Sequence, residues 1–431
     1  MSRFFRQTLH IIASRGMLLI LGVATGILTA RLLGPEGKGL LAKLLVLPML
    51  AAALGEMGIR QSIAYLVGQQ RYKEADIQAS MMALFLMTAS VGLAVVLIGY
   101  WALGVFDSGW VLPLVVASLA PLALLQKYAG GLFLGRQRIE RINYIQLLHQ
   151  GGRFVLVAAL VALAGWGVLG AGVGFVAAQG AALALLLFWV GRRASLRPRW
   201  ISPIPTELLK RGLVYGVSLL VLVLNYRVNI LMLGKMRGDA SVGIFTTGMA
   251  ICELLRQLPL AVGAVLFSHS VGWRPGQAER KLRSVVLLAR IILFLAIVSA
   301  GVIAAVAWWV VPFAYGQAFQ DSARVVWVLL PGTVALSAFL TLHLFAAGQG
   351  RPELALYAFG PGLVLNVVLN LCLIPKWDYL GAALGSVISY AFAVLIFLLL
   401  FRRRYHVKLR EILVPRPSDL AAVLAYRKGA S

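Results

Sequence analysis

The chain has 431 residues, of which 61% are hydrophobic and only 13% are charged. Soluble domains are about half apolar and about a quarter charged, so this composition excludes a soluble globular protein and indicates an integral membrane protein. The net charge is +25, from 40 Lys and Arg residues against 15 Asp and Glu residues. Most of these cations flank apolar segments, which indicates membrane topology and contact with anionic membrane lipids, and we expect no nucleic-acid partner.

Apolar stretches long enough for one transmembrane helix each, about 20 residues, recur from the N-terminus to the basic tail. The sequence predicts twelve such spans, at 11–31, 40–58, 80–104, 110–134, 149–165, 168–190, 212–234, 242–267, 285–311, 325–347, 354–375 and 380–401. The basic segment Met1–Arg15 resembles the start of a signal peptide. No small-residue cleavage site follows it before the next span, so we expect a retained first helix.

A basic, proline-containing stretch divides these spans into two sets of six. The predicted parts are an N-terminal six-helix bundle, a basic cytoplasmic linker, a C-terminal six-helix bundle and a basic cytoplasmic tail, at residues 1–191, 192–211, 212–401 and 402–431. An even number of spans per half is typical of parallel repeats with a central substrate cavity between them. The fold class expected is therefore an all-α integral membrane protein with about twelve transmembrane helices in two six-helix parallel-repeat bundles.

A weak internal echo supports the two repeats. The segment LLGPEGKGLL, with Gly34 and Gly39, aligns with MRGDASVGIF, which contains Gly238 and Gly243. Chance matching of glycines in a glycine-rich chain is the alternative.

The excess of Lys and Arg in the linker, the tail and the other segments on the same side follows the positive-inside rule and predicts both termini in the cytoplasm.

Motifs for cofactors and metals are absent or out of context. GWGVLG (165–170) matches a dinucleotide fingerprint but lies at a turn between two predicted spans, not between a strand and a helix. No Walker A sequence occurs, the five histidines lack metal-ligand spacing, and Cys252 and Cys372 both lie in apolar segments. We therefore expect no cofactor and no metal site.

Three charged residues in two successive predicted spans form a candidate cluster. Arg227 occurs in LVLNYRVNILML (222–233), about 10 Å below the outer interface at the rise of an α-helix. Glu253 and Arg256 occur in ICELLRQLP, where their spacing places them on one helix face. A charge at such a depth costs roughly 3 kcal/mol on insertion scales, so these side chains require a partner or a wet cavity.

Two interpretations of this cluster stay open. In one, Glu253 neutralises Arg256, while Arg227 reaches outward or pairs with Glu253, and the group is structural. In the other, the residues line a cavity and bind an anionic substrate, because guanidinium groups match phosphate oxygens. Two arginines against one glutamate leave a net positive charge, which favours binding.

Further charges lie near the expected cytoplasmic mouth. Arg15 occurs at the start of the first span, and Glu56 and Arg60 occur in GEMGIRQS. These residue types at span ends are most often boundary residues. If they face the cavity, they form an entry ring for an anion that arrives from the cytoplasm.

Four stretches spread over the chain resemble a known family: ARLLGPEGKGLLA (30–42), NYRVNILMLG (225–234), VGIFTTGMAICELLRQLPLAVGAVLF (242–267) and NVVLNLCLIPKWDYLGAALGSVISY (366–390). They resemble the Wzx-type oligosaccharide-lipid flippases, a polysaccharide transporter family of the multidrug/oligosaccharidyl-lipid/polysaccharide exporter superfamily. The resemblance implies a bacterial plasma (inner) membrane protein that moves undecaprenyl-pyrophosphate-linked oligosaccharide from the cytoplasmic to the periplasmic leaflet by alternating access, without ATP hydrolysis. It also implies polysaccharide polymerase and chain-length proteins as partners.

The candidate substrate-binding residues are therefore Arg227, Arg256, Glu253, Asn229, Arg15 and Arg60, and the resemblance implies that Arg227 faces the substrate. Many relatives carry an acid where this chain has Asn229, so ion coupling here would use Glu253 or Glu56, or would be absent. A lipid II flippase or a multidrug/cation antiporter of the same superfamily is the alternative function. A membrane O-antigen polymerase or ligase ranks lower, because the longest outer connection, near 312–324, is too short to build an active site, and we expect no enzyme activity.

Overall fold

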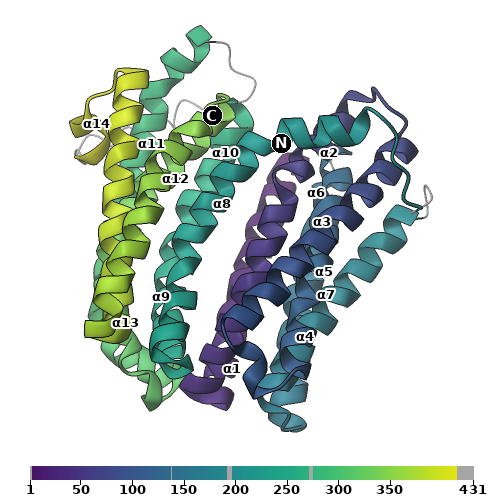
Figure 1. Ribbon diagram of the computed structural model, residues 1–431. Helices are drawn as coiled ribbons and strands as arrows, with labels where there is room; N and C mark the ends of the chain where they lie inside the picture. The colour runs from purple at the N-terminus through teal and green to yellow at the C-terminus, as the bar shows by residue number, and fades with distance from the viewer. Residues whose placement is uncertain (1, 137, 192–196, 271–274, 415–431) are drawn as a thin grey trace. The chain divides into compact units, whose positions relative to one another are not determined.

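A computed structural model describes the backbone of residues 2–136, 138–191, 197–270 and 275–414. Within these ranges the side chains of 2–15, 108, 139, 211, 213–215, 264, 265, 267–270 and 275–281 are not described. The described chain is helical, which confirms the all-α prediction (Figure 1). Its elements are α1 (Ser2–Glu56), α2 (Ile59–Gln69), α3 (Glu74–Ala102), η1 (Val105–Ser108), α4 (Val111–Ala117), α5 (Leu119–Gly135), α6 (Ile139–Val157), the π-helical η2 (Ala158–Leu163), α7 (Gly167–Gly191), α8 (Ile204–Arg237), α9 (Asp239–Leu255), α10 (Gln257–Ser270), α11 (Pro275–Tyr315), η3 (Gln317–Phe319), α12 (Ser322–Gly348), α13 (Glu353–Tyr405) and α14 (Leu409–Leu413).

Nine helical segments in the described part of the chain are long and apolar enough to cross a membrane. The protein is therefore a multi-pass membrane protein. Two of these segments exceed the length of a single crossing, because α1 has 55 residues and α13 has 53. The exact number of crossings stays a prediction.

Both long helices are kinked at one residue with a positive φ angle. In α1 this residue is Gly34, with φ 66° and ψ −177°, and Pro35 follows it. Only glycine adopts this backbone conformation readily, and proline cannot continue the hydrogen bonding of the preceding turn. In α13 the kink lies at Asp378, with φ 52°. Each kink falls between two of the predicted spans.

The described chain clusters into two compact units. Unit 1 comprises Met1–Val223 with Gly238–Gly243, and unit 2 comprises Leu224–Arg237 with Ile244–Ser431. The boundary falls inside α8 because the first turns of this helix pack on the α1–α2 junction. A methyl group on Gly212 would lie 2.1 Å from the carbonyl oxygen of Met57, so only glycine permits this approach. The predicted parts at 1–191, 192–211, 212–401 and 402–431 stay predictions.

Each unit has its own apolar core. In unit 1 it joins α2, α3, α5 and α7, and the buried Tyr128 donates a 2.7 Å hydrogen bond to the carbonyl oxygen of Gly55 in α1. In unit 2 a group of aromatic rings ties α12 to α13. Phe339 lies 4.5 Å from Phe359 and 4.8 Å from Phe397 between ring centroids, and all three are fully buried. These cores hold the helices that carry the polar residues of the membrane interior.

Candidate functional site

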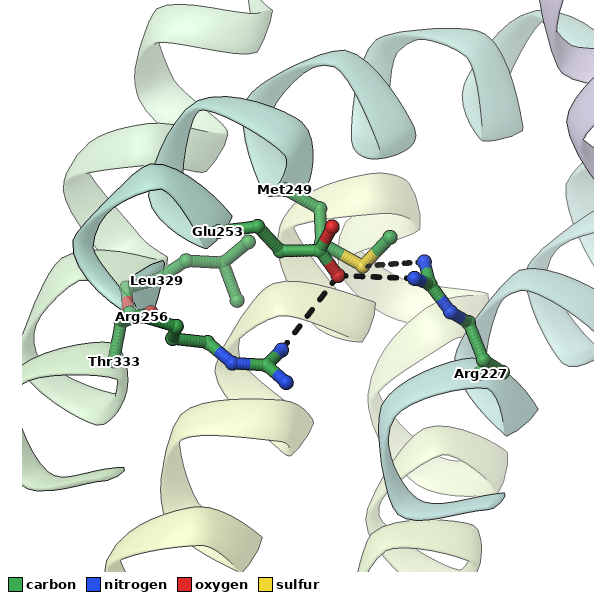
Figure 2. Close-up of polar contacts among 6 residues, drawn as sticks. All are labelled: Arg227, Met249, Glu253, Arg256, Leu329 and Thr333. Atoms are coloured by element: carbon green, nitrogen blue, oxygen red, sulfur yellow. Dashed lines mark hydrogen bonds and ion pairs between the residues drawn. The ribbon is translucent and has the colours of Figure 1, made fainter. Parts of the chain in front are cut away.

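Three elements of unit 2 bring the predicted charged cluster together (Figure 2). Arg227 lies in α8, about 15 Å of helix before the end at Arg237, so it is deeper than the sequence suggested. Glu253 lies in the last turn of α9. Arg256 occupies the break between α9 and α10. Pro259 explains this break, because its ring removes one backbone donor and displaces the carbonyl of the preceding turn.

A single carboxylate oxygen holds both arginines. Glu253 Oε1 lies 3.1 Å from Arg227 Nη2 and 3.6 Å from Arg256 Nη1. Arg227 Nη1 also lies 4.0 Å from Met249 Sδ, and Figure 2 marks this contact with a dashed line. The three charged side chains are 24%, 29% and 18% exposed in the order Arg227, Glu253, Arg256. The cluster therefore carries one net positive charge and keeps part of its surface accessible.

Aromatic side chains pack beside Arg256 of the cluster. The Arg256 guanidinium carbon lies 4.1 Å from the centroid of the Tyr226 ring, which is a close cation–π contact. Tyr226 in turn packs edge-on against Tyr390, with 5.5 Å between centroids. A cavity of about 20 Å³ borders these groups, enough for about one water molecule. Tyr226 Oη and Arg256 Nε are both buried and have no hydrogen-bond partner within the described residues.

Asn229 lies two residues after Arg227 but in a different environment. It is fully buried, and its amide donates to Ser386 Oγ and accepts a 2.7 Å hydrogen bond from Asn370 Nδ2. Asn366 extends the network, because it donates to the backbone carbonyl of Asn225 at 3.1 Å. This buried ladder ties α8 to α13. A substrate contact for Asn229 stays a prediction, while its amide already has structural partners.

The structure places the residues predicted for an entry ring on two helices, and the ring itself stays a prediction. α1 ends at Glu56, Gly58 takes a left-handed conformation, and α2 begins at Ile59, so Glu56 and Arg60 lie on different helices. Glu56 pairs with Lys127 Nζ at 2.7 Å. Arg60 is half-buried on α2. The backbone of Arg15 lies in α1, and its side chain is outside the described residues.

Sequence reasoning missed Arg153. The predicted span began at 149, which placed this arginine at the membrane boundary. The structure begins α6 at Ile139, so Arg153 lies about 20 Å along the helix. The signal was present in the sequence, because INYIQLLHQGG (142–152) contains no proline to end a helix. Because this segment is polar, the predicted span did not include the first turns of the helix.

The described residues contain no group of three His, Cys, Asp or Glu side chains that could hold a metal ion. The chemistry that this site offers is therefore that of guanidinium, carboxylate, phenol and amide groups. Such groups bind and release an anion or a proton, and they orient a polar ligand inside an apolar surrounding.

The family model described as polysaccharide biosynthesis protein matches residues 4–267, more than half of the chain. A search of the curated proteins finds no match. Among solved structures, an inward-facing multidrug resistance MATE family transporter of the MOP superfamily superposes with a TM-score of 0.74 at 19% identity, covering 90% of this chain and 94% of that chain. The lipid II flippase MurJ, in an inward closed conformation, gives 0.72 at 13% identity, with coverages of 91% and 87%. An outward-facing MATE transporter gives 0.63 at 18% identity, with 91% and 93%.

These structural likenesses establish the fold, which this chain shares with MATE transporters and with a lipid II flippase. The match to the family model covers unit 1, α8, α9 and most of α10, including Arg227, Glu253 and Arg256. By this match the chain belongs to the polysaccharide biosynthesis protein family.

Proposed function

We propose that this protein flips polyprenyl-pyrophosphate-linked oligosaccharide units, with undecaprenyl as the lipid, from the cytoplasmic to the periplasmic leaflet of the bacterial inner membrane for surface polysaccharide synthesis. The family match and the likeness to a lipid II flippase support a lipid-linked sugar as the cargo. A polysaccharide polymerase and chain-length proteins would act on the flipped unit. Transport would proceed by alternating access, and it would not require ATP bound to this chain, which has no Walker A sequence.

The observation that carries this proposal is the single carboxylate shared by two arginines. Glu253 balances one of the two charges, so Arg227 and Arg256 retain one positive charge inside the membrane. Holding a charge there is costly, and a pyrophosphate would offset the cost because guanidinium forks match its oxygens. The cavity behind Arg256 is too small for this group. The ligand would therefore approach the partly exposed Arg227 and Glu253.

A multidrug/cation antiporter is the second candidate, and the likeness to MATE transporters motivates it. The net charge of the cluster argues against an antiporter of cationic drugs, because a net positive charge repels a cationic drug. A lipid II flippase remains the nearer alternative, since lipid II also presents a pyrophosphate. Substitution of Arg227 distinguishes ligand binding from a structural role but not these two pyrophosphate-linked cargoes. The lipid-linked precursors that accumulate on loss of the gene identify the cargo.

The test is export and membrane abundance for three variants of Arg227. Arg227→Ala should reduce polysaccharide export by about tenfold or more at normal abundance, because a charge-assisted hydrogen bond contributes roughly 1.5–3 kcal/mol. Arg227→Lys should restore part of the export, since it keeps the charge but loses the bidentate fork. Arg324, an exposed arginine of α12 that pairs with Asp321, provides the matched control as Arg324→Ala. An abundant and fully active Arg227→Leu protein would contradict the proposal.

A further inference from the structure

A group of arginine and aromatic side chains lies where α5 ends, α6 begins and α7 ends, within unit 1. Phe133, Arg141 and Trp189 each lie next to the boundary of a candidate membrane span, and these spans are Val111–Gly135, Glu140–Leu163 and Gly167–Gly191. Because the apolar part of all three helices ends here, the group lies at the level of the lipid head groups. The distribution of Lys and Arg along the chain predicts that this level faces the cytoplasm.

Two aromatic rings hold the side chain of Arg141. Its guanidinium carbon lies 5.0 Å from the centroid of the Trp189 ring and 5.6 Å from the centroid of the Phe133 ring. The two rings contact each other edge to face, with 6.3 Å between their centroids. Cation–π contacts of this kind position a guanidinium group without neutralising its charge.

No carboxylate neutralises Arg141 in the described part of the chain. Its side chain makes no ion pair and no hydrogen bond with the described residues. Arg136 provides a contrast, because it packs on the same Phe133 ring at 5.2 Å from the centroid and forms an ion pair with Glu74. Glu140 precedes Arg141 in the sequence, but it is exposed and does not pair with it. Arg141 therefore presents one positive charge that is positioned by aromatic rings and is not balanced by a carboxylate.

Two further side chains of α6 border this arginine. Tyr144 lies one turn after it, is 55% exposed and packs against Trp189 with 6.0 Å between ring centroids. A phenol suits the head-group level, because its ring contacts apolar chains while its hydroxyl reaches polar groups. Arg138, before the first turn of α6, is exposed and adds a second cation. Basic pockets between transmembrane helices at the cytoplasmic surface bind the head groups of anionic lipids.

We infer that Arg141 binds the phosphate of an anionic glycerophospholipid, with Phe133 and Trp189 holding the guanidinium group in place. The fork of N–H donors on a guanidinium group matches the two unbridged oxygens of a phosphodiester, and the single charges cancel. The exposed ring of Tyr144 contacts the first carbons of the lipid chains, which a soluble phosphate lacks. This site differs from the general attraction of basic segments to the membrane, because one arginine and its two rings define it. The inference does not depend on which molecule the protein transports.

The test uses the purified full-length protein in micelles that contain phosphatidylglycerol and phosphatidylcholine with identical acyl chains. Native mass spectrometry then counts the lipid molecules that stay bound. The wild type should retain phosphatidylglycerol in preference to phosphatidylcholine. Arg141→Gln should retain one phosphatidylglycerol molecule fewer, because the affinity of the site falls about tenfold or more. Arg402→Gln, which removes the same charge from the exposed last turn of α13, is the matched control and should behave as the wild type.

Three results would overturn the inference. Arg141→Gln could retain as much phosphatidylglycerol as the wild type does. Arg402→Gln could lose as much as Arg141→Gln, which would leave only the overall positive charge of this membrane face. Glycerophosphoglycerol, the head group without acyl chains, could displace the bound lipid at an equal concentration, which would make the ligand a soluble anion. If Arg141→Gln is not produced, Arg141→Lys takes its place, because lysine lacks the fork of donors: weaker retention supports the inference, and wild-type retention overturns it.

Discussion

Glu253 stabilises two arginines through one oxygen atom. The distances of 3.1 Å and 3.6 Å from Glu253 Oε1 to the two guanidinium groups leave both cations dependent on the same carboxylate. Partial exposure of the three side chains lowers the energy of each contact relative to a fully buried pair. Sequence spacing predicted the Glu253–Arg256 contact. The additional contact from Arg227 was one of several open possibilities, because it depends on how α8 packs on α9.

Glu253→Gln should therefore lower the stability of the folded protein by about 1–3 kcal/mol, since the amide cannot neutralise the two guanidinium groups. The measurement is the melting temperature of the purified protein, with Glu140→Gln, an exposed carboxylate on α6, as the control. An unchanged melting temperature would show that the carboxylate does not stabilise the arginines. Export by the same variant at several pH values tests its second role: normal export throughout would exclude Glu253 as a proton carrier.

Helix α1 and the start of α9 approach each other through glycines. Within unit 1, a methyl group on Gly39 would lie 1.7 Å from the carbonyl oxygen of Asp239, and one on Gly243 would lie 2.0 Å from the carbonyl oxygen of Pro35. Lys43 Nζ pairs with Asp239 Oδ1 at 2.6 Å beside this contact. Gly39 and Gly243 are the pair that the internal echo aligned. The echo thus corresponds to a packing requirement of both segments.

Gly39→Ala should reduce the melting temperature and the membrane abundance of the protein. The backbone carbonyl of Asp239 cannot move aside as a flexible side chain would, and overpacking of this kind costs roughly 1–3 kcal/mol or more. Gly26→Ala is the matched control on the same helix, because a methyl group there meets nothing within 4 Å. Equal stability of the two variants would contradict the close approach. A loss confined to Gly39→Ala supports it.

At the scale of the whole molecule, the distribution of charge predicts the orientation in the membrane. The cations around the 192–211 stretch and at Arg402–Arg404 place these segments in the cytoplasm under the positive-inside rule. Trp200, which is 56% exposed, and the exposed Arg403 give labelling positions in the described parts of these segments. Lys376 lies on the side expected to face outward.

In a variant with Cys252 and Cys372 replaced by serine, Trp200→Cys and Arg403→Cys should resist an impermeant thiol reagent added to intact cells. Lys376→Cys should react with it, and all three should react after the membrane is opened. Labelling of Trp200→Cys from outside would reverse the predicted orientation. This result would also reverse the direction of transport that we propose, because the cytoplasmic leaflet would then face the other end of the helices.

The sequence alone determined the membrane class, the helical fold and the approximate positions of the apolar segments. Hydrophobicity and helix length are local properties, so twenty neighbouring residues decide them without reference to the rest of the chain. The same local reasoning identified Arg227, Glu253 and Arg256, because a charge inside an apolar run is visible in the run itself. The kinks near Gly34 and Asp378 also lay where the apolar pattern was interrupted.

Only the tertiary structure decided which side chains meet. Glu56 pairs with Lys127 of α5, and a left-handed residue, Gly58, separates the end of α1 from the start of α2, which carries Arg60. Asn229 forms hydrogen bonds with Asn370 and Ser386 on α13, which lie far from it in the sequence. The depth of Arg153 along its helix depended on where α6 begins. The first turns of α6 are polar, but they are helical because they belong to a helix that packs against α7 and α1. Contacts of this kind arise from packing between helices, and no local pattern of residues encodes them.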